Sequence, residues 1–384
     1  MNLHGTLRTL EVAKGMRNLA SFVHISTGYV NSFMLDQRIE EKIYPHPFSV
    51  NPLQIFESLG KMSPQEMEEY ERDVVLKIYP NTYVFAKSLT EHLLKIQCRS
   101  EGIPLAIVRP TIVSGTLSEP IMGWSDGIQA ASAMILSAAL GHFQTWCGRE
   151  TTIFDMIPVD VLVKIILLSA PRAIVVRADH SPFIALAGTG TTPDPPTTQK
   201  FFGGVAQYWQ SAVPVPQRRV SNDIRMEMYE PRDFDRWFQQ QYATEIATIQ
   251  AFDKMDEKAK SSLGKTKNKN MLALKRQLEV IYGRPAQFAF FMSNSWYLEN
   301  KNARQLDQEA PRELSSDGVL EKGINWLKYI HFMNLGIHEF VLKEQVDRTM
   351  IIPYQRLIPI QKTFVPKVSK NVVGQKEDGV VARL

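Results

Sequence analysis

The chain has 384 residues, of which 44% are hydrophobic and 22% are charged, and its formal net charge is +4. This length has room for two or three domains, and the composition is that of an ordinary soluble globular protein. The small net charge, without a basic stripe interleaved with aromatic residues, excludes nucleic acid as the main partner. Lys265, Lys267 and Lys269 form one short basic stretch, which we interpret as a solvated loop.

The two cysteines, Cys98 and Cys147, have neither the spacing of a zinc site nor that of a disulfide framework. The histidines show no ligand pattern either, so we expect no metal. No signal peptide is expected, because the basic-then-apolar pattern is absent at the N-terminus. The longest apolar runs are too short to span a bilayer.

The first eighty residues predict two helices and one buried strand. Residues 7–17 have the apolar periodicity of a helix, and residues 21–27 have the composition of a strand that needs parallel neighbours. Residues 28–62 are polar and broken by prolines, which predicts a long active-site loop. A capping box at Ser63 and Glu66 predicts a helix that ends near Tyr79.

The next segment completes a strand–helix–strand unit. Pro80 and Asn81 begin a helix of about four turns that ends near Ser100, and residues 104–110 form a second buried strand. This order predicts a right-handed crossover in a parallel sheet. The loop of residues 111–127 then follows the carboxyl end of a strand, where open α/β sheets bind ligands.

The predicted fold class is α/β, with a Rossmann-type doubly wound parallel sheet followed by a smaller, mostly helical C-terminal domain. The boundaries are 1–240 for the nucleotide-binding domain, 241–345 for the helical domain and 346–384 for a basic tail that we expect to be mobile. No glycine-rich dinucleotide loop occurs in the sequence. A phosphate-binding loop is followed directly by a helix. Gly188-Thr189-Gly190 is not expected to be one, because no helix begins directly after it.

Tyr83 and Lys87 lie four residues apart and therefore share one face of the predicted helix. A close ammonium favours the phenolate, so Lys87 is expected to lower the pKa of Tyr83 and make it a proton donor near neutral pH. The alternative is a surface pair in which the lysine lies along the ring. The spacing alone leaves both interpretations open.

With these pieces in order, the chain resembles the alcohol-forming fatty acyl-CoA reductases, a family of extended short-chain dehydrogenases related to plant male-sterility proteins. The motifs that carry the resemblance are Phe22-Val23-His24-Ile25-Ser26-Thr27-Gly28-Tyr29, Pro80 to Lys87, Ile107 to Val113, Glu119 to Trp124, Ile157-Pro158-Val159-Asp160 and the region Trp326 to Glu344. Together they cover roughly residues 2–345.

The resemblance implies a mechanism in which NADPH reduces a long-chain acyl-CoA to a fatty alcohol. Tyr83 would protonate the oxyanion, Lys87 would hold the nicotinamide ribose, and Thr27, with Ser26 as the alternate, would bind the carbonyl oxygen. Asn2 would hold a water that relays protons behind Lys87.

Other residues are implied to bind the cofactor or the substrate. Pro110 and Thr111 would contact the cofactor, and Trp124 would line the acyl pocket or simply pack within its loop. Arg109 would either reach a CoA phosphate or pair with an acid. His24, inside an apolar strand, is expected to be a core residue.

The resemblance also implies that the first βαβ units and the glycine phosphate loop are missing, since Asn2 to Thr6 resembles a motif found well inside such proteins. We therefore expect little or no NADPH oxidation by residues 1–384. An alternative is an inactive paralogue or fragment that binds acyl-CoA or scaffolds a full-length reductase. A sugar- or sterol-directed dehydrogenase fits the Tyr83–Lys87 pair but not the helical C-terminal region.

The end of the chain, Ala382-Arg383-Leu384, is a variant of the Ser-Lys-Leu peroxisomal address. It predicts recognition by a peroxisomal import receptor and a peroxisomal or glycosomal location, which would suit ether-lipid synthesis. The alternatives are the cytoplasm and the surface of the endoplasmic reticulum. The phenylalanine-rich helical region is expected to form ordinary core, with contact to acyl chains or peripheral contact to a membrane surface as the alternatives.

Overall fold

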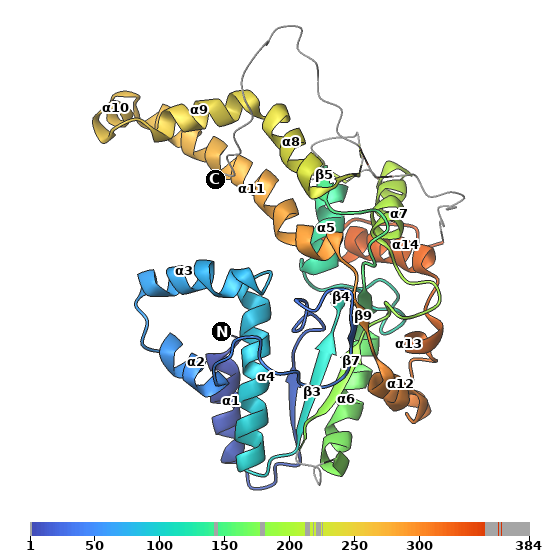
Figure 1. The fold of residues 1–384 in the computed structure, drawn as a ribbon. Coiled ribbons are helices and arrows are strands. Elements are labelled where there is room, and N and C mark those ends of the chain that lie inside the picture. Colours follow the sequence, from blue (N-terminus) through green and yellow to red (C-terminus); the bar gives the residue numbers. More distant parts are fainter. Residues whose placement is uncertain are drawn as a thin grey trace.

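The computed structural model describes residues 2–141, 145–176, 181–211, 216–217, 219, 224, 226–349, 360 and 362, and Figure 1 shows their arrangement. The helices that begin before residue 200 are α1 (His4–Lys14), α2 (Pro52–Leu59), α3 (Pro64–Asp73), α4 (Thr82–Ser100), α5 (Ala130–Ala139), α6 (Val159–Val175) and α7 (Thr198–Ser211). The later helices are α8 (Pro231–Gln241), α9 (Ala243–Asp253), α10 (Glu257–Ser262), α11 (Lys265–Ser293), α12 (Lys301–Gln308), α13 (Val319–Lys322) and α14 (Trp326–Gly336). The strands are β1 (Phe22–Ile25), β2 (Arg38–Ile39), β3 (Leu105–Pro110), β4 (Ile112–Ser114), β5 (Thr145–Cys147), β6 (Met156–Pro158), β7 (Phe183–Ala187), β8 (Glu227–Tyr229) and β9 (Tyr297–Leu298).

A parallel sheet with the strand order β1-β3-β7 lies at the centre of the fold. The register pairs Val23 with Ala106 and Ile107 with Ile184. All six residues of β3 are buried, as expected for the middle strand of a parallel sheet covered on both faces. The predicted crossover from β1 through α4 to β3 is confirmed.

Helices cover both faces of this sheet (Figure 1). Leu105 and Ile107 of β3 pack in one hydrophobic cluster with side chains of α1 and α4, while Ala106 and Val108 pack on the opposite face with α6 and α12. This alternation follows from the two-residue period of a strand. The α/β class with a doubly wound parallel sheet is therefore confirmed.

Local capping signals account for the helices near the site. The Asn81 side chain accepts a hydrogen bond from Val84 N and begins α4, and Ser63 and Glu66 form the predicted capping box of α3. The prediction of an irregular loop over residues 28–62 is wrong in part, since α2 lies within it. Asn51 caps that helix and Pro52 takes its first position, where a missing N–H has no cost.

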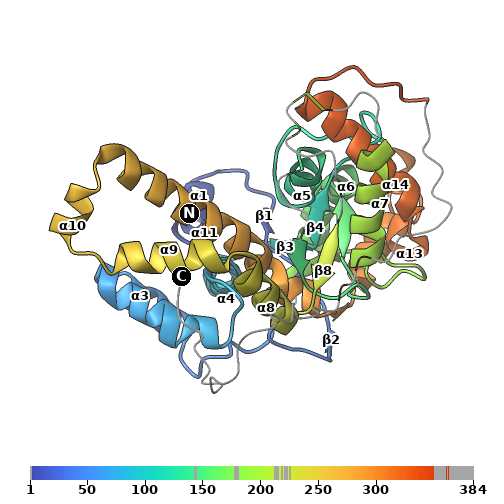
Figure 2. The same ribbon diagram turned by 90° about the horizontal axis from the view of Figure 1, so that it is seen from above.

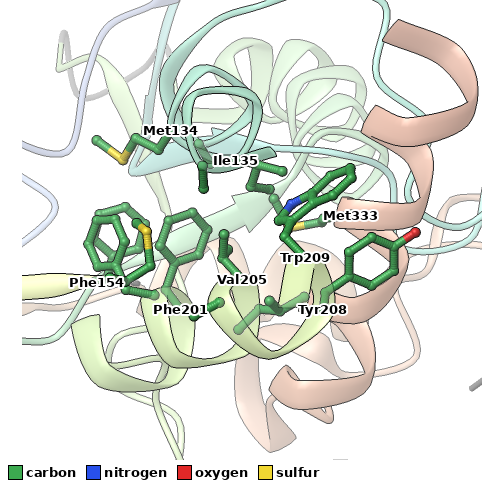
Figure 3. Packing of buried hydrophobic residues seen from close by; sticks show 14 of the residues in the cluster. Met134, Ile135, Phe154, Phe201, Val205, Tyr208, Trp209 and Met333 are labelled. Atoms are coloured by element: carbon green, nitrogen blue, oxygen red, sulfur yellow. The ribbon is translucent and has the colours of Figure 1, made fainter. Parts of the chain in front are cut away.

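The C-terminal part of the chain packs on the earlier elements. Helix α14 lies against α7, and α12 lies against β7 and α6. Figure 3 shows how the α7 residues Phe201, Val205 and Trp209 meet Ile135 of α5 and Met333 of α14 in a shared hydrophobic cluster. The domain boundary near residue 240 stays a prediction.

Helices α8 to α11 form an arm that extends from this body, with α10 at its far end in Figures 1 and 2. A small hydrophobic cluster that includes Phe238, Ile249 and Leu278 holds α8, α9 and α11 together. The interpretation of Lys265, Lys267 and Lys269 as part of a loop is wrong. They lie on the first turns of α11, which continues without a break to Ser293.

In the part of the chain that the structure describes, no helix combines the length and the apolar character that crossing a membrane requires. The predicted tail falls almost wholly outside the described residues, and so does its terminal tripeptide, Ala382-Arg383-Leu384.

Candidate active site

A cavity of about 760 Å³ lies at the carboxyl ends of β1 and β3, and α11 of the arm forms part of its wall. One part of its lining carries hydroxyl groups, from Ser26, Thr27, Tyr83 and Thr111. The remainder is largely apolar and includes Trp124, Met134, Phe154, Phe288, Phe291 and Met292. Six of the residues proposed from the sequence (Ser26, Thr27, Tyr83, Pro110, Thr111 and Trp124) therefore share one cavity.

Tyr83 and Thr27 come from different elements and meet in this cavity. Thr27 follows β1 and is buried, whereas the Tyr83 side chain on the first turn of α4 is 46% exposed. Burial of part of its ring raises the pKa of Tyr83, and a hydrogen bond with the Thr27 side chain opposes this shift. The hydroxyls of Thr27 and Tyr83 can thus both donate a hydrogen bond to one acceptor oxygen.

Lys87 lies one turn after Tyr83, with its Nζ 5.9 Å from the centre of the Tyr83 ring. The ammonium donates a hydrogen bond of 2.8 Å to the carbonyl oxygen of Ile25 at the end of β1. Burial lowers the pKa of Lys87 itself. The expectation that Lys87 lowers the pKa of Tyr83 is not met, because its charge faces the end of β1 and burial dominates at the phenol.

Asn2 does not line the cavity, but it lies beside α4 close to Lys87. Its carbonyl oxygen accepts hydrogen bonds from Thr6 at 2.9 Å and from Thr90 at 3.3 Å. Since Thr90 follows Lys87 by three residues, the N-terminal segment is tied to the catalytic helix behind the lysine. The proposed relay role of the Asn2 side chain stays a prediction.

Pro110 and Thr111 end the central strand at the bottom of the cavity. Gly28 N donates to the Pro110 carbonyl at 2.7 Å, which joins the segment after β1 to the end of β3. The Thr111 hydroxyl lies 3.1 Å from Oδ1 of Asp155, a fully buried carboxyl group. The same Oδ1 accepts a bond of 2.8 Å from Thr189 N.

Asp155 was not proposed from the sequence as part of the site, although it begins the Asp-Met-Ile-Pro stretch before α6. Burial raises the pKa of Asp155 to about 6, and hydrogen bonds from Thr189, Gly190 and Thr111 limit the shift. The segment of Gly188 to Gly190, which failed as a phosphate loop, instead wraps around this carboxyl. A Cβ at Gly190 would lie 2.5 Å from Oδ2 of Asp155.

The loop that carries Trp124 is fastened at both ends. Asp160 at the start of α6 accepts hydrogen bonds from the main-chain N–H groups of Leu117, Ser118 and Glu119 at 2.8–3.1 Å. At the other end, Gly123 has a φ of +83° and lies against the main chain of α14. Trp124 is thereby held at the cavity wall.

Phe288, Phe291 and Met292 of α11 also line the cavity. The sequence leaves acyl-chain contact open for the phenylalanine-rich region as a whole but assigns none of these three residues to the site. Their aromatic run was visible in the sequence, but nothing local shows that α11 reaches back to the mouth of the sheet. Arg109 does not reach the cavity and pairs with Glu91 instead. His24 is buried beside them as expected, and burial lowers its pKa to about 4.

The donor set fits the nicotinamide end of a dinucleotide cofactor. Hydroxyl groups gather where β1 and β3 end, the place where doubly wound sheets bind such ligands, and Lys87 lies directly behind them. A carbonyl oxygen in this corner would meet the donors Thr27 and Tyr83, with room for an apolar group on the other side. Such an arrangement suits hydride transfer to a carbonyl carbon.

Residues 1–166 match the NAD-binding family model described as male sterility protein. Fatty acyl-CoA reductase 1 of Xenopus laevis is 25% identical over 361 residues, and fatty acyl-CoA reductase 2 of Homo sapiens is 25% identical over 357 residues. Each match covers 90% of this chain but 63% of the relative. The terminal R domain of the myxalamid biosynthetic pathway aligns with a TM-score of 0.47 at 12% identity, over 89% of this chain and 64% of that domain.

The family match and the parallel β1-β3-β7 sheet indicate an NAD-binding domain of α/β class over the first part of the chain. More particularly, the relatives that match 90% of this chain are fatty acyl-CoA reductases, to which it is similar at 25% identity. It spans 63% of the length of the relatives that it matches.

Proposed function

We propose that the protein reduces long-chain fatty acyl-CoA to fatty alcohol with NADPH at the cavity between β1, β3 and α11. The observation that carries this proposal is the mixed lining of the cavity. Hydroxyl groups of Thr27 and Tyr83 and apolar side chains such as Met134, Phe288 and Phe291 line the same space. A thioester with a long alkyl chain needs both surfaces at once.

The overall reaction is a four-electron reduction of the thioester to a primary alcohol, with release of free CoA thiol. When bound, NADPH supplies the two hydrides that this reduction consumes. Thr27 and Tyr83 donate hydrogen bonds to the carbonyl oxygen as negative charge develops on it. In each hydride transfer Tyr83 gives its proton to that oxygen and is protonated again from solvent. Between the two transfers the hemithioacetal hydroxyl loses its proton to solvent, the C–S bond breaks to leave the aldehyde, and the departing sulfur takes up a proton from solvent as free CoA thiol.

The chain's own residues supply the nicotinamide end of the cofactor site. Lys87 would hold the ribose hydroxyls, and Pro110 and Thr111 would contact the ring. The sequence contains no glycine-rich loop for the pyrophosphate. Since that loop contributes cofactor affinity rather than the proton donor, we expect slow turnover that appears only at high NADPH.

The test is a single-turnover reaction of the 384-residue protein with palmitoyl-CoA and about 1 mM NADPH that carries deuterium on C4, a concentration at the upper end of typical KM values. We expect deuterium in palmitaldehyde or hexadecanol and loss of the signal in Tyr83→Phe. Tight palmitoyl-CoA binding without labelled product would overturn the catalytic part of the proposal. Absence of binding would overturn the assignment of the cavity.

A second candidate is a protein that binds acyl-CoA or scaffolds a complete reductase without catalysis. The apolar side chains of the cavity lining favour it, because they would hold an acyl chain whether or not hydride transfer follows. The same experiment separates the two, since the second candidate predicts binding of palmitoyl-CoA and no transfer of deuterium at any NADPH concentration.

We further propose a peroxisomal or glycosomal location, which rests only on Ala382-Arg383-Leu384. A fluorescent fusion at the N-terminus tests it, with a Leu384 deletion as the matched control. Import that depends on Leu384 supports recognition by the import receptor. A cytoplasmic or reticular distribution of both proteins contradicts it.

A further inference from the structure

Positive charge is concentrated in one segment of the molecule. Residues 254–276 contain eight lysines and arginines and two acids, a net charge of +6 in a chain whose total is +4. The other 361 residues therefore carry a net charge of −2. This segment spans α10 and the first turns of α11, which form the far end of the arm (Figures 1 and 2).

Much of this charge is free to meet a partner. Lys254, Lys258, Lys265, Lys267 and Lys269 are all exposed, and none of them forms an ion pair within the part of the chain that the structure describes. Lys275 is different, because it pairs with Asp253 at 2.7 Å. The five free lysines thus have no internal role in holding the arm together.

Apolar side chains lie among the free lysines. Lys265, Lys269, Leu272 and Arg276 follow one another at spacings of four, three and four residues, so they share one face of α11. Leu272 is 48% exposed in the middle of that face, and Met255, at the turn before α10, is 36% exposed. Leu272 thus adds an exposed apolar side chain to a helix face that is otherwise basic.

We propose that the end of this arm docks on an anionic lipid membrane. Its lysines would meet the lipid head groups, and Leu272 and Met255 would enter the boundary with the acyl chains. A polyanion without apolar groups, such as a nucleic acid, would satisfy the charge but would leave Leu272 and Met255 exposed. The place of the arm favours the membrane as well, because α10 projects from the body and can reach a flat surface.

The proposal does not depend on the proposed activity. It would nevertheless place a helix that lines the cavity at the membrane surface, since α11 carries basic residues at one end and Phe288 and Phe291 at the other. A substrate with a long alkyl chain could then reach the cavity from the lipid side.

Sedimentation with sucrose-loaded vesicles tests the proposal on the full chain. We expect binding to phosphatidylcholine vesicles that contain about one quarter phosphatidylserine, and weak binding to phosphatidylcholine alone. Salt should weaken the binding, because screening shortens the reach of the lysine charges. Equal binding to both kinds of vesicle, or to neither, would overturn the proposal.

Two sets of five substitutions remove the same charge from different places. The arm variant replaces Lys254, Lys258, Lys265, Lys267 and Lys269 with Gln. The control variant replaces the exposed lysines Lys61, Lys77, Lys301, Lys322 and Lys328 with Gln. Each lysine near an anionic surface strengthens binding about fivefold, so the arm variant should lose at least about 100-fold in vesicle affinity and the control much less.

A third variant, Met255→Ser with Leu272→Ser, separates a membrane from a soluble polyanion. We expect it to weaken binding to phosphatidylserine vesicles about tenfold while leaving heparin binding unchanged. Unchanged vesicle binding would instead assign the arm to a soluble acidic partner. Far-ultraviolet circular dichroism of every variant should match the wild type, since all these side chains are exposed.

Discussion

The guanidinium of Arg109 and the carboxylate of Glu91 form a bidentate ion pair in the interior of the protein. Nε and one terminal nitrogen of Arg109 donate to the two carboxylate oxygens at 2.9 and 2.6 Å. The side chains are 1% and 2% exposed. The pair joins the middle strand, β3, to α4, one turn after Lys87, and so fixes the helix that carries the proposed proton donor.

Replacing Arg109 with Met should destabilise the protein by about 3–5 kcal/mol, because Glu91 would be left as a buried charge without its partner. Although burial opposes its ionisation, the Arg109 guanidinium lowers the pKa of Glu91. Urea unfolding would measure the change in the free energy of unfolding. The Arg109→Met/Glu91→Leu double variant should recover much of the loss.

A matched control is Arg72→Met, which removes an exposed pair with Asp73 whose nitrogen–oxygen distance of 2.7 Å is similar. Exposed pairs contribute little, so no measurable change is expected. If Arg109→Met were as mild as Arg72→Met, the buried pair would not anchor α4 in the way we infer.

Tyr83→Phe should reduce hydride transfer to palmitoyl-CoA at least about 100-fold, since it removes the proton donor. Palmitoyl-CoA affinity, measured by calorimetry, should stay within about twofold, because the ring remains in place. Thr27→Val should reduce hydride transfer as well, by a smaller factor, as one of two donors to the carbonyl oxygen is lost. Burial raises the pKa of Tyr83, so its phenol stays protonated through neutral pH and the wild-type rate should not fall until about pH 10 or above.

Tyr297→Phe serves as the control, because this tyrosine is 55% exposed on β9 and does not line the cavity. Its rate should equal that of the wild type. A Tyr83→Phe protein with the wild-type rate would remove Tyr83 from the mechanism and leave Thr27 or Ser26 as the donor to the carbonyl oxygen.

The elements around the site could be predicted because their signals are local. Asn81 caps α4, Ser63 and Glu66 cap α3, and the apolar residues of β3 identify a covered strand within six positions. Helix α2 had an equally local signal in Asn51 and Pro52. The surrounding prolines nevertheless favour a loop prediction for the whole stretch.

The contacts that shape the cavity could not be predicted in the same way, because they join residues far apart in the chain. Thr111 meets Asp155 across 44 positions. Phe288 lines the same cavity as Thr27 only because α11 runs back from the arm to the sheet. The pKa of Tyr83 was predicted with the wrong sign for a related reason. Helical spacing places Lys87 on the same face but does not show that its ammonium turns to Ile25.

Gly123→Ala should destabilise the protein by about 3 kcal/mol, because a Cβ at this position would lie 1.9 Å from the carbonyl oxygen of Phe332 in α14. The φ of +83° adds backbone strain for any residue with a side chain. Thermal or urea unfolding measures the loss. Gly127→Ala, in the same loop but with no atom within 4 Å of its Cβ, should change stability by less than about 0.5 kcal/mol. Equal changes in the free energy of unfolding for the two substitutions would show that the loop can shift at Gly123. The loop would then not fix the position of Trp124.

Asp155 should make the folded state less stable as the pH rises. Its carboxyl has an ordinary pKa of 3.8, and burial raises the folded-state pKa to about 6. Between these two pH values the Asp155 carboxyl binds more protons in the folded state than in the unfolded state. Its contribution to the free energy of unfolding is therefore largest below pH 4 and declines as the pH rises to 6. The full difference corresponds to about 3 kcal/mol. Asp155→Asn should abolish this contribution, because the amide does not titrate.

The measurement needs a variant in which residue 41 does not titrate. Burial raises the pKa of the Glu41 carboxyl to about 7, so Glu41 also makes the folded state less stable as the pH rises. We therefore compare Glu41→Gln with Glu41→Gln/Asp155→Asn by urea unfolding at several pH values between 4 and 7. The free energy of unfolding of the single variant should fall, relative to that of the double variant, by about 2–3 kcal/mol over this range. Parallel curves would mean that Asp155 is charged at no cost in the folded protein. A cation or a water would then have to lie beside its carboxylate, and the Thr111 hydroxyl would donate to a charged carboxylate even between pH 4 and 6.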